Sequence, residues 1–265
     1  RQALDAGARR ILIGIGGSAT VDGGMGMAAA LGVRFLDVRG QPIGDCCGGR
    51  LADVAAIDPA SLDERIPRTE IVVASDVTNP LTGPLGAALV FGPQKGATPE
   101  QARQLDRGLA SLARLIETQL GVAVDALPGA GAAGGLGAGL VAFLGARIRS
   151  GVETVIEVAR LDERMQGSAL VLTGEGRLDG QTVHGKTVAG VAAAAARHGI
   201  PVVALAGSLQ PGYEALYGRG VVCALSIVDR PMDLAAAMAD APGLLERAAE
   251  SVVRLWSAAG GGGHV

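Results

Sequence analysis

The sequence predicts an α/β protein with parallel sheets, divided into two domains. From residue 169 onward, apolar runs rich in β-branched residues alternate with helical segments. This order gives parallel strands joined by right-handed crossovers. Three apolar runs in the chain also end in polar loops with glycine, as strands do at the carboxyl edge of a parallel sheet. The length of 265 residues suits one large α/β domain or two smaller ones.

Short strands and glycine-rich loops make up the first part of the chain. Each expected strand is an apolar run that ends at glycine, proline or polar residues. The expected elements are a short helix ending near Gly7, a strand over 10–15, a helix over 23–32, a short strand over 33–37, a surface loop over 40–49, and strands over 69–75 and 88–92.

A long amphipathic helix is expected over 98–120. Thr98 is a favourable N-cap, Pro99 occupies the first helical position, and Gln101 completes a capping box. Apolar residues recur at helical spacing, at Leu105, Leu109, Leu112, Ile116 and Leu120. Arginine and glutamate fill the other positions, so this helix is predicted to be structural.

The second half of the chain begins with helices and continues with the strand–helix alternation. Helices are expected after the glycine-rich stretch 129–139, as far as about Arg147, and over 151–165. Strands follow over 169–173, 201–206 and 220–225, with helices over 187–198, 211–218 and up to residue 257. A boundary near 160–168 divides the chain into a first domain, 1–165, and a second domain, 166–265.

Composition and charge narrow the function classes. The net charge of −3, without a basic stripe, argues against a nucleic acid partner. Cys46, Cys47 and Cys223 form no even framework and no CxxC motif, so we interpret them as ordinary thiols of a cytoplasmic protein. Residues 126–146 carry no charge, but glycine and alanine dominate them. We therefore favour a buried loop and helix there over a membrane span.

Two phosphate-site patterns occur in the wrong context. Gly14–Ala19 matches GxGxxA after a strand, but no acidic residue ends a second strand at the expected distance. Gly129–Gly134 matches GxGxxG without a preceding strand. Residues 180–187 match GxxxxGK[ST], yet six residues separate them from their strand. Glycine amides and a lysine at a helix start nevertheless suit phosphate oxygens.

Four carboxylates lie in glycine-flanked loops: Asp22, Asp76, Glu175 and Asp179. Carboxylates in such loops either cap helices and turns or hold Mg²⁺ and position a nucleophile. Ser18 and Thr20 are candidate phosphate donors or caps of the helix that follows. His184 and Lys95 are candidate site residues, with a structural or solvent-exposed role as the alternative for each.

Four long motifs resemble the bacterial glycerate kinase family of the two-domain class I type. They are GIGGSATVDGGMGM, ASDVTNPLTGPLGAALVFGPQKGATPE, LPGAGAAGGLGAGL and LTGEGRLDGQTVHGK, and the resemblance covers residues 1 to about 257. It implies ATP-dependent phosphorylation of D-glycerate, with the 2-phosphate favoured, in organic acid and glyoxylate metabolism. With the loop carboxylates as candidate ligands, the expected cofactors are ATP and Mg²⁺.

The resemblance further implies two α/β domains with the active site in the cleft between them. One domain is Rossmann-like and discontinuous, and the other is inserted within it. Residues 1–165 correspond to the inserted domain, and 166–265 to the C-terminal part of the Rossmann-like domain. The N-terminal segment with which family members begin is absent from this sequence. The partners are then D-glycerate and ATP, without nucleic acid or membrane, and a homodimer is left open.

Site roles are hypotheses built on these motifs. Asp179 orients or deprotonates the substrate hydroxyl, Asp76 and Glu175 serve Mg²⁺ or the substrate, and Lys186 and Arg177 bind phosphate or carboxylate. The catalytic set is then Asp179, Asp76 and Lys186. The metal set is Glu175 and Asp76. The expected substrate and nucleotide contacts are Gly16, Gly17, Ser18, Thr20, Asn79, Thr173, Gly174, Gly176, Arg177 and His184.

Two alternatives belong to other classes. The chain could bind a nucleotide or oligomerise without turnover. It could also be an NAD(P)-dependent dehydrogenase that uses the GxGxxA loop.

Overall fold

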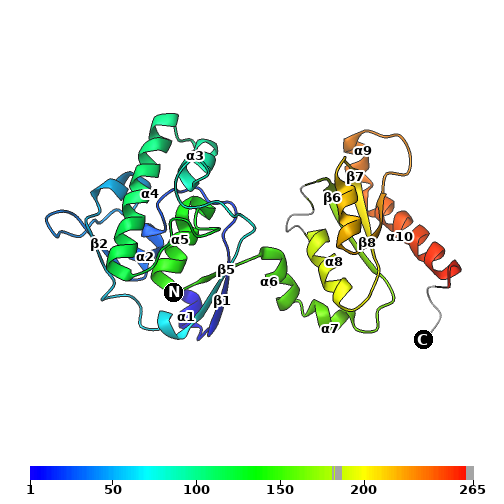
Figure 1. Cartoon of the computed structure of the whole chain (residues 1–265), viewed down its shortest axis with the longest axis horizontal. Helices are drawn as coiled ribbons and strands as arrows, with labels where there is room; N and C mark the ends of the chain where they lie inside the picture. Colours follow the sequence, from blue (N-terminus) through cyan, green and yellow to red (C-terminus); the bar gives the residue numbers. More distant parts are fainter. Residues whose placement is uncertain (181, 183–186, 261–265) are drawn as a thin grey trace. The chain divides into compact units, whose positions relative to one another are not determined.

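A computed structural model describes residues 1–180, 182 and 187–260. The fold is α/β with parallel sheets, as predicted. The chain forms two compact units, Arg1–Gly151 and Val152–Val265, which Figure 1 colours from blue to green and from green to red. The division falls between Gly151 and Val152, ahead of the boundary expected near 160–168. The assignment of 1–165 to an inserted domain stays a prediction.

A parallel sheet organises the first unit. Its strands β1 (Arg10–Gly14), β4 (Glu70–Ala74) and β5 (Arg147–Arg149) lie in the order β1-β4-β5. The central strand β4 buries Ile71, Val72 and Val73 in succession, as a strand covered on both faces does. A separate antiparallel pair joins β2 (Arg34–Leu36) to β3 (Ala56–Asp58).

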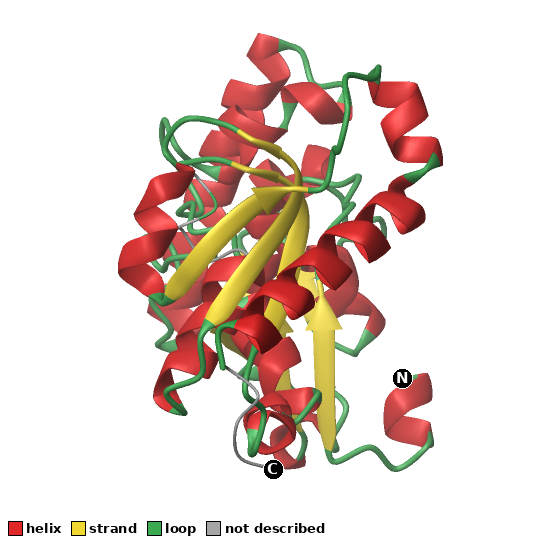
Figure 2. Ribbon diagram, turned by 90° about the vertical axis from the view of Figure 1, so that its right-hand side faces the viewer, coloured by secondary structure: helices red, strands yellow, loops and turns green. Residues whose placement is uncertain are grey.

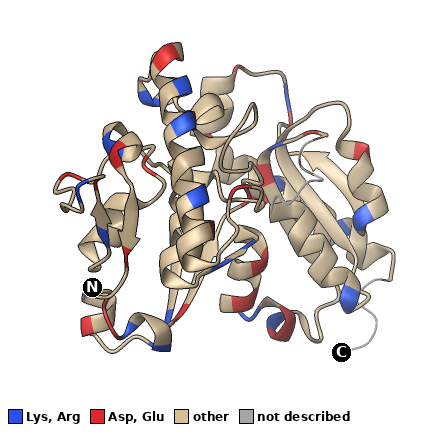
Figure 3. Cartoon of the chain, turned by 60° about the vertical axis from the view of Figure 1, so that its left-hand side comes forward, with Lys and Arg blue, Asp and Glu red and all other residues tan. Residues whose placement is uncertain are grey.

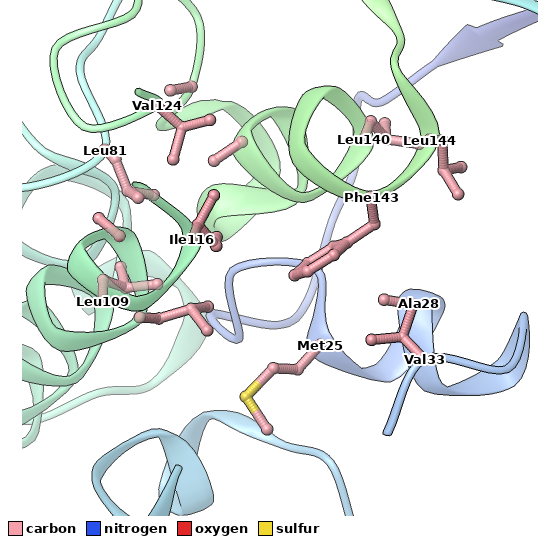
Figure 4. Close-up of a cluster of buried hydrophobic side chains, with 14 of the residues drawn as sticks. Met25, Ala28, Val33, Leu81, Leu109, Ile116, Val124, Leu140, Phe143 and Leu144 are labelled. Atoms are coloured by element: carbon pink, nitrogen blue, oxygen red, sulfur yellow. The ribbon is translucent and has the colours of Figure 1, made fainter. Parts of the chain in front are cut away.

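The core of the first unit lies between helices. They are α1 (Gln2–Asp5), α2 (Met25–Ala30), α3 (Ala87–Phe91), α4 (Pro99–Leu120) and α5 (Ala132–Leu144), with 3₁₀ turns η1 (Gly48–Asp53), η2 (Ile66–Arg68) and η3 (Pro93–Lys95). Figure 4 shows Met25 of α2, Leu109 and Ile116 of α4, and Phe143 of α5 among the packed side chains. Aliphatic side chains therefore build most of this core.

Helix α4 confirms the predicted capping box. The Gln101 N–H donates to Thr98 Oγ1 at 3.2 Å, and the Thr98 N–H donates to Gln101 Oε1 at 2.8 Å. Gly121, with a φ of 71°, ends the helix in a left-handed conformation. The apolar stripe at Leu109, Leu112 and Ile116 is fully buried. Local sequence signals were sufficient to predict α4, because the N-cap, the apolar stripe and the terminal glycine all indicate the same helix.

The expected strand over 88–92 is wrong. These residues belong to α3, in which the N–H of Val90 donates to Gly86 O and that of Gly92 to Ala88 O. A short apolar run has the same composition in a buried helix as in a buried strand, so sequence pattern could not separate them.

The glycine-rich beginning of α5 folds against the loop that follows β1. Ala133, Gly134 and Gly135 are left-handed, with φ of 56°, 73° and 89°. A Cβ on Gly134 would lie 1.9 Å from Thr20 O, and the N–H of Gly23 donates to Gly134 O at 3.1 Å. Backbone packs on backbone here, which explains the glycines of both motifs. In the part of the chain that the structure describes, no helix is both long and apolar enough to cross a membrane.

The second unit is a three-stranded parallel sheet with helices on both faces, as Figure 2 shows. Its strands are β6 (Val171–Leu178), β7 (Val202–Leu209) and β8 (Val221–Ser226), in that order. Val202, Ala204 and Ala206 pack with α8 (Thr187–Arg197), whereas Val203 and Leu205 pack with α10 (Ala241–Ala258). The remaining elements are α6 (Gly151–Val158), α7 (Leu161–Met165), η4 (Tyr213–Arg219) and α9 (Leu234–Ala239). The predicted strand–helix alternation is confirmed.

Strand β6 is longer than predicted. It continues through Gly174–Leu178, which the sequence pattern assigns to a loop, because these residues pair in register with β7. A Cβ on Gly174 would lie 2.3 Å from Leu205 O. Glycine therefore serves close strand packing at this position rather than a turn.

An ion cluster at the surface of the second unit predicts acid sensitivity. Arg197 Nη2 lies 2.8 Å from Asp162 Oδ2, and His198 Nε2 lies 3.0 Å from Asp162 Oδ1. Hydrogen bonds from Arg197, and then from His198, lower the pKa of Asp162. Because the folded pKa is depressed, the carboxylate stabilises the fold above its unfolded pKa, and this stability is lost as pH falls through the folded pKa.

At pH 5 we expect a larger free energy of unfolding for the wild type than for Asp162→Asn. This difference should shrink when the pH is lowered below the unfolded pKa of Asp. Urea unfolding followed by the fluorescence of Trp256 measures it, because this residue of α10 is the single tryptophan of the sequence and reports on the second unit. An advantage of equal size at both pH values would exclude a contribution from the ionised Asp162.

Charged residues of both signs are interspersed over each unit, as the blue and red segments of Figure 3 show.

Candidate active site

The loop after β1 presents backbone donors. Among the residues that the structure describes, no N–H of residues 16–20 donates a hydrogen bond, and Gly17 is left-handed with a φ of 70°. Gly24, not Ser18 or Thr20, is the N-cap of α2, so the capping alternative for these two hydroxyl residues is wrong. Adjacent N–H groups of this kind form an anion-binding concavity. Gly16, Gly17, Ser18 and Thr20, the predicted substrate or nucleotide contacts, all lie in this loop.

Asp22 has the structural role that the sequence left open. Its carboxylate accepts from the N–H of Gly24 at 3.0 Å and from the N–H of Gly26 at 3.1 Å, at the start of α2. The side chain is 8% exposed. Both oxygens therefore serve the helix terminus, where a negative charge is favourable.

Asp76 and Asn79 follow β4 at the carboxyl edge of the first sheet. Asp76 Oδ1 accepts from Ser150 Oγ at 3.0 Å and from the N–H of Gly151 at 2.9 Å, at the start of α6. Asn79 Nδ2 donates to Leu85 O at 2.8 Å. Parallel strands place the loops after β1, β4 and β5 at one edge, since Gly14, Ala74 and Arg149 lie in register.

Asp179 directly follows β6, and neighbouring residues hold its side chain. Its Oδ1 accepts from the N–H of Thr182 at 3.2 Å and from Thr182 Oγ1 at 3.3 Å, and Arg177 Nε donates to its Oδ2 at 3.1 Å. The Asp179 side chain is 16% exposed, whereas that of Arg177 is 64% exposed. The fully buried Thr182 was missed by sequence analysis; the D-x-x-T spacing of a hydrogen-bonded turn could have indicated it.

A groove of about 1000 Å³ lies beside β6 in the second unit. Thr173, Gly174, Glu175 and Gly176 line one side, Ser208 of β7 adds a hydroxyl, and apolar residues of α9 and α10 form most of the remainder. The backbone of Glu175 pairs with β7, and its carboxylate makes no hydrogen bond or ion pair with any described residue. Gly174 and Gly176 belong to a strand, so the expected glycine loop at this place is wrong.

His184 and Lys186 lie outside the described residues, as does most of the GxxxxGK[ST] pattern. Among the described residues, no group of three or more His, Cys, Asp and Glu side chains could hold a metal ion. Mg²⁺ does not require a group of three protein ligands, because it is commonly bound by one or two carboxylates together with substrate phosphates and water. A lone Glu175 in the groove satisfies that requirement.

Comparisons with known proteins agree on one family. A family model described as "Glycerate kinase family" matches residues 1–257. The chain is 52% identical over 257 residues to the glycerate kinase of Halalkalibacterium halodurans, covering 96% of this chain and 67% of that protein. It is 47% identical over 227 residues to the glycerate 2-kinase of Escherichia coli K12, covering 86% of this chain and 59% of that protein.

A solved structure assigned as glycerate kinase 2 of Salmonella typhimurium LT2 has the same fold. The TM-score is 0.84 at 46% identity, with 98% of this chain and 67% of the other covered. The chain thus spans about two thirds of the length of the relatives it matches. With a family match over residues 1–257 and relatives at this identity, the chain belongs to the glycerate kinase family.

Proposed function

We propose that this chain carries ATP-dependent kinase activity toward D-glycerate, with 2-phosphoglycerate as the favoured product. The observation that carries the proposal is the family match over residues 1–257, to which 52% identity with a glycerate kinase adds support. The choice of the 2-hydroxyl rests on the 47% identity with a protein named glycerate 2-kinase. This family membership favours a kinase over the dehydrogenase alternative.

Asp179 is the proposed group that orients or deprotonates the hydroxyl of glycerate. Phosphoryl transfer depends mainly on positioning the nucleophile and stabilising charge on the transferred group. Thr182 and Arg177 hold the Asp179 carboxylate through three contacts of 3.1 to 3.3 Å, and the Asp179 N–H donates to Thr182 Oγ1 at 3.0 Å. Because these contacts already restrict the Asp179 side chain, less conformational entropy is lost when the transition state forms.

The groove beside β6 is the proposed nucleotide site. Its apolar walls from α9 and α10 suit a purine ring, and Thr173 and Ser208 offer hydroxyl donors for the phosphates. When bound, Mg²⁺ would neutralise charge on the phosphate oxygens. Glu175 would hold that ion, and Arg177 and Lys186 would contact phosphate or carboxylate oxygens.

The first unit is proposed to bind an anionic part of a substrate. Residues 16–18 offer backbone donors, Thr20 lies on the same loop, and Asp76 and Asn79 follow the neighbouring strand. Asp76 is expected to act on substrate or Mg²⁺ through Oδ2, since Oδ1 already accepts from Ser150 and Gly151. His184 keeps its proposed role as a substrate contact.

A coupled assay of ADP formation tests the proposal. We expect ADP to form only when D-glycerate, ATP and Mg²⁺ are all present, with the Halalkalibacterium halodurans glycerate kinase as positive control. Nucleotide binding by calorimetry without D-glycerate-dependent ADP formation would instead support the alternative of a nucleotide-binding chain without turnover. A cytoplasmic location is inferred from the use of ATP.

A further inference from the structure

Lysine is rare in this chain, and its placement is selective. Of 23 Lys and Arg residues, 21 are arginine and two are lysine, Lys95 and Lys186. Both lysines lie next to glycine in polar segments, GPQKG and VHGKT. A chain that uses arginine for nearly every cation keeps an amine at these two positions. Lys95 lies in the part of the chain that the structure describes.

The Lys95 ammonium is seated on the loop that follows β1. Its Nζ donates to Ser18 Oγ at 2.8 Å and to Thr20 O at 2.7 Å. The lysine comes from η3, which Gly96 ends with a φ of 93°. Its sequence distance from the loop is more than 70 residues, so tertiary structure rather than local sequence brings the amine to the loop.

Both hydrogen-bond partners of the Lys95 ammonium, Ser18 Oγ and Thr20 O, are uncharged. Among the described residues, Lys95 makes no ion pair with a carboxylate, because Asp22 directs both oxygens to the backbone of α2. Burial lowers the pKa of Lys95, and the more distant charge of Asp22 opposes that effect. A partly buried ammonium that rests on a hydroxyl and a carbonyl is incompletely compensated, and an anion would complete its environment.

Space for a ligand lies beside it. A cavity of about 380 Å³ is lined by Lys95, by Ala19 of the β1 loop, and by Gly48 and Gly49 of η1. The side chains of Gln101 and Gln104 on α4 add polar groups. The volume is sufficient for a small carboxylate or phosphate group together with water.

We propose that Lys95 and residues 16–20 form an anion-binding subsite in the first unit, which takes the carboxylate or a phosphate of a substrate. The ammonium supplies the charge, and the N–H groups of the loop, which donate to no described residue, supply directed donors. This inference deepens the proposed function and rests on it for the identity of the substrate. It adds Lys95 as a binding residue to the loop residues predicted from sequence.

The same geometry explains why arginine does not stand here. A compact ammonium fits between two oxygens at 2.7 and 2.8 Å and still has a third N–H for a ligand. A planar guanidinium is larger and has its donors fixed in a fork. Arginine at position 95 is therefore expected to displace the loop or fill the cavity.

The scarcity of lysine makes a direct test possible. The 265-residue chain is labelled with a limiting amine reagent, and peptide mass spectrometry separates Lys95 from Lys186 and the N-terminal amine. We expect a ligand at the subsite to reduce labelling of Lys95 by at least about fivefold, since an occupied ammonium is both shielded and held protonated. Protection by D-glycerate identifies a carboxylate; protection by ATP or inorganic phosphate identifies a phosphate.

Variants provide the second measurement. Calorimetry with the protecting ligand is expected to show affinity at least about tenfold weaker for Lys95→Met, which is 1.4 kcal/mol. Lys95→Arg should be weakened similarly, whereas Arg103→Met, the loss of an exposed charge on α4, should bind as the wild type does. Circular dichroism confirms that each variant is folded.

The two proposals fail separately. Protection of Lys95 by phosphate or glycerate in a chain without kinase activity would support the subsite and contradict the proposed function. Unchanged Lys95 labelling with all three ligands, or unchanged affinity of Lys95→Met, would overturn the subsite even in an active kinase. Equal weakening by Arg103→Met would also overturn it, because general charge attraction would then suffice.

Discussion

Replacing Asp179 by Asn is expected to lower kcat for D-glycerate phosphorylation by about 100-fold or more, the effect of removing a general base or an essential orienting group. The amide is nearly isosteric with the carboxylate. Its oxygen can still accept from the N–H of Thr182, so the turn at the end of β6 should persist. What the substitution removes is the negative charge and the capacity to accept a proton.

The expected split between kinetic constants follows from that role. KM for ATP should change little, because Asp179 is not proposed to bind the nucleotide, and the loss should fall on kcat. Thr182→Val is the matched control: it removes the 3.3 Å contact from Thr182 Oγ1 to Asp179 Oδ1 but keeps the carboxylate. It should reduce kcat less than Asp179→Asn does. A loss below tenfold for Asp179→Asn would exclude Asp179 as base and as essential orienter.

Gly134→Ala is expected to destabilise the first unit by about 3–5 kcal/mol. Two costs add. The left-handed φ of 73° disfavours any Cβ, and that Cβ would lie 1.9 Å from Thr20 O, 2.8 Å from Thr20 C and 2.9 Å from Val21 Cα. The clash is with backbone, which no rotamer change relieves. Displacement of Thr20 would also disturb the carbonyl that accepts from Lys95.

Ala133→Gly is the control for this prediction. Ala133 already has a left-handed φ of 56°, so glycine there should stabilise the unit by about 1 kcal/mol. Urea unfolding followed by far-UV circular dichroism measures both variants, since Trp256 lies in the other unit. A Gly134→Ala loss below about 1 kcal/mol would mean that the backbone contact with Thr20 is easily relieved.

Sequence reasoning succeeded where local signals determine structure. Helix α4 was predicted with its cap and stripe because Thr98, Gln101 and the apolar spacing act over a few residues. The order of β6, β7 and β8 with intervening helices was predicted because apolar runs and helix stops alternate regularly. In both cases propensity, pattern and packing favour the same structure.

Sequence patterns did not predict the elements whose conformation depends on contacts with residues distant in sequence. Strand β5, Arg147–Arg149, carries two arginines in three residues and is a strand because β4 offers it an edge. The glycines of β6 indicated a loop, yet Gly174 is glycine because Leu205 O lies close to its backbone. Propensity is a weak guide when tertiary packing determines the outcome.

The candidate site shows the same division. Motifs identified the loops after β1 and β4, since strand ends with glycine and polar residues are visible in sequence, whereas the glycine loop expected after Thr173 is part of β6. The partners of each side chain were not visible: Asp22 caps α2, Asp76 bonds to Ser150 and Gly151, and Lys95 joins the β1 loop from η3. Which loop residue is structural and which is available to a ligand depends on these distant contacts.

The most direct test of the kinase assignment is the identity of the product. The chain is incubated with ATP, Mg²⁺ and D-glycerate, and the reaction is followed by ³¹P nuclear magnetic resonance with authentic phosphoglycerates as standards. We predict ADP and 2-phosphoglycerate in equal amounts. ATP left unchanged at high enzyme concentration, under conditions in which the Halalkalibacterium halodurans enzyme turns over, would contradict the assignment.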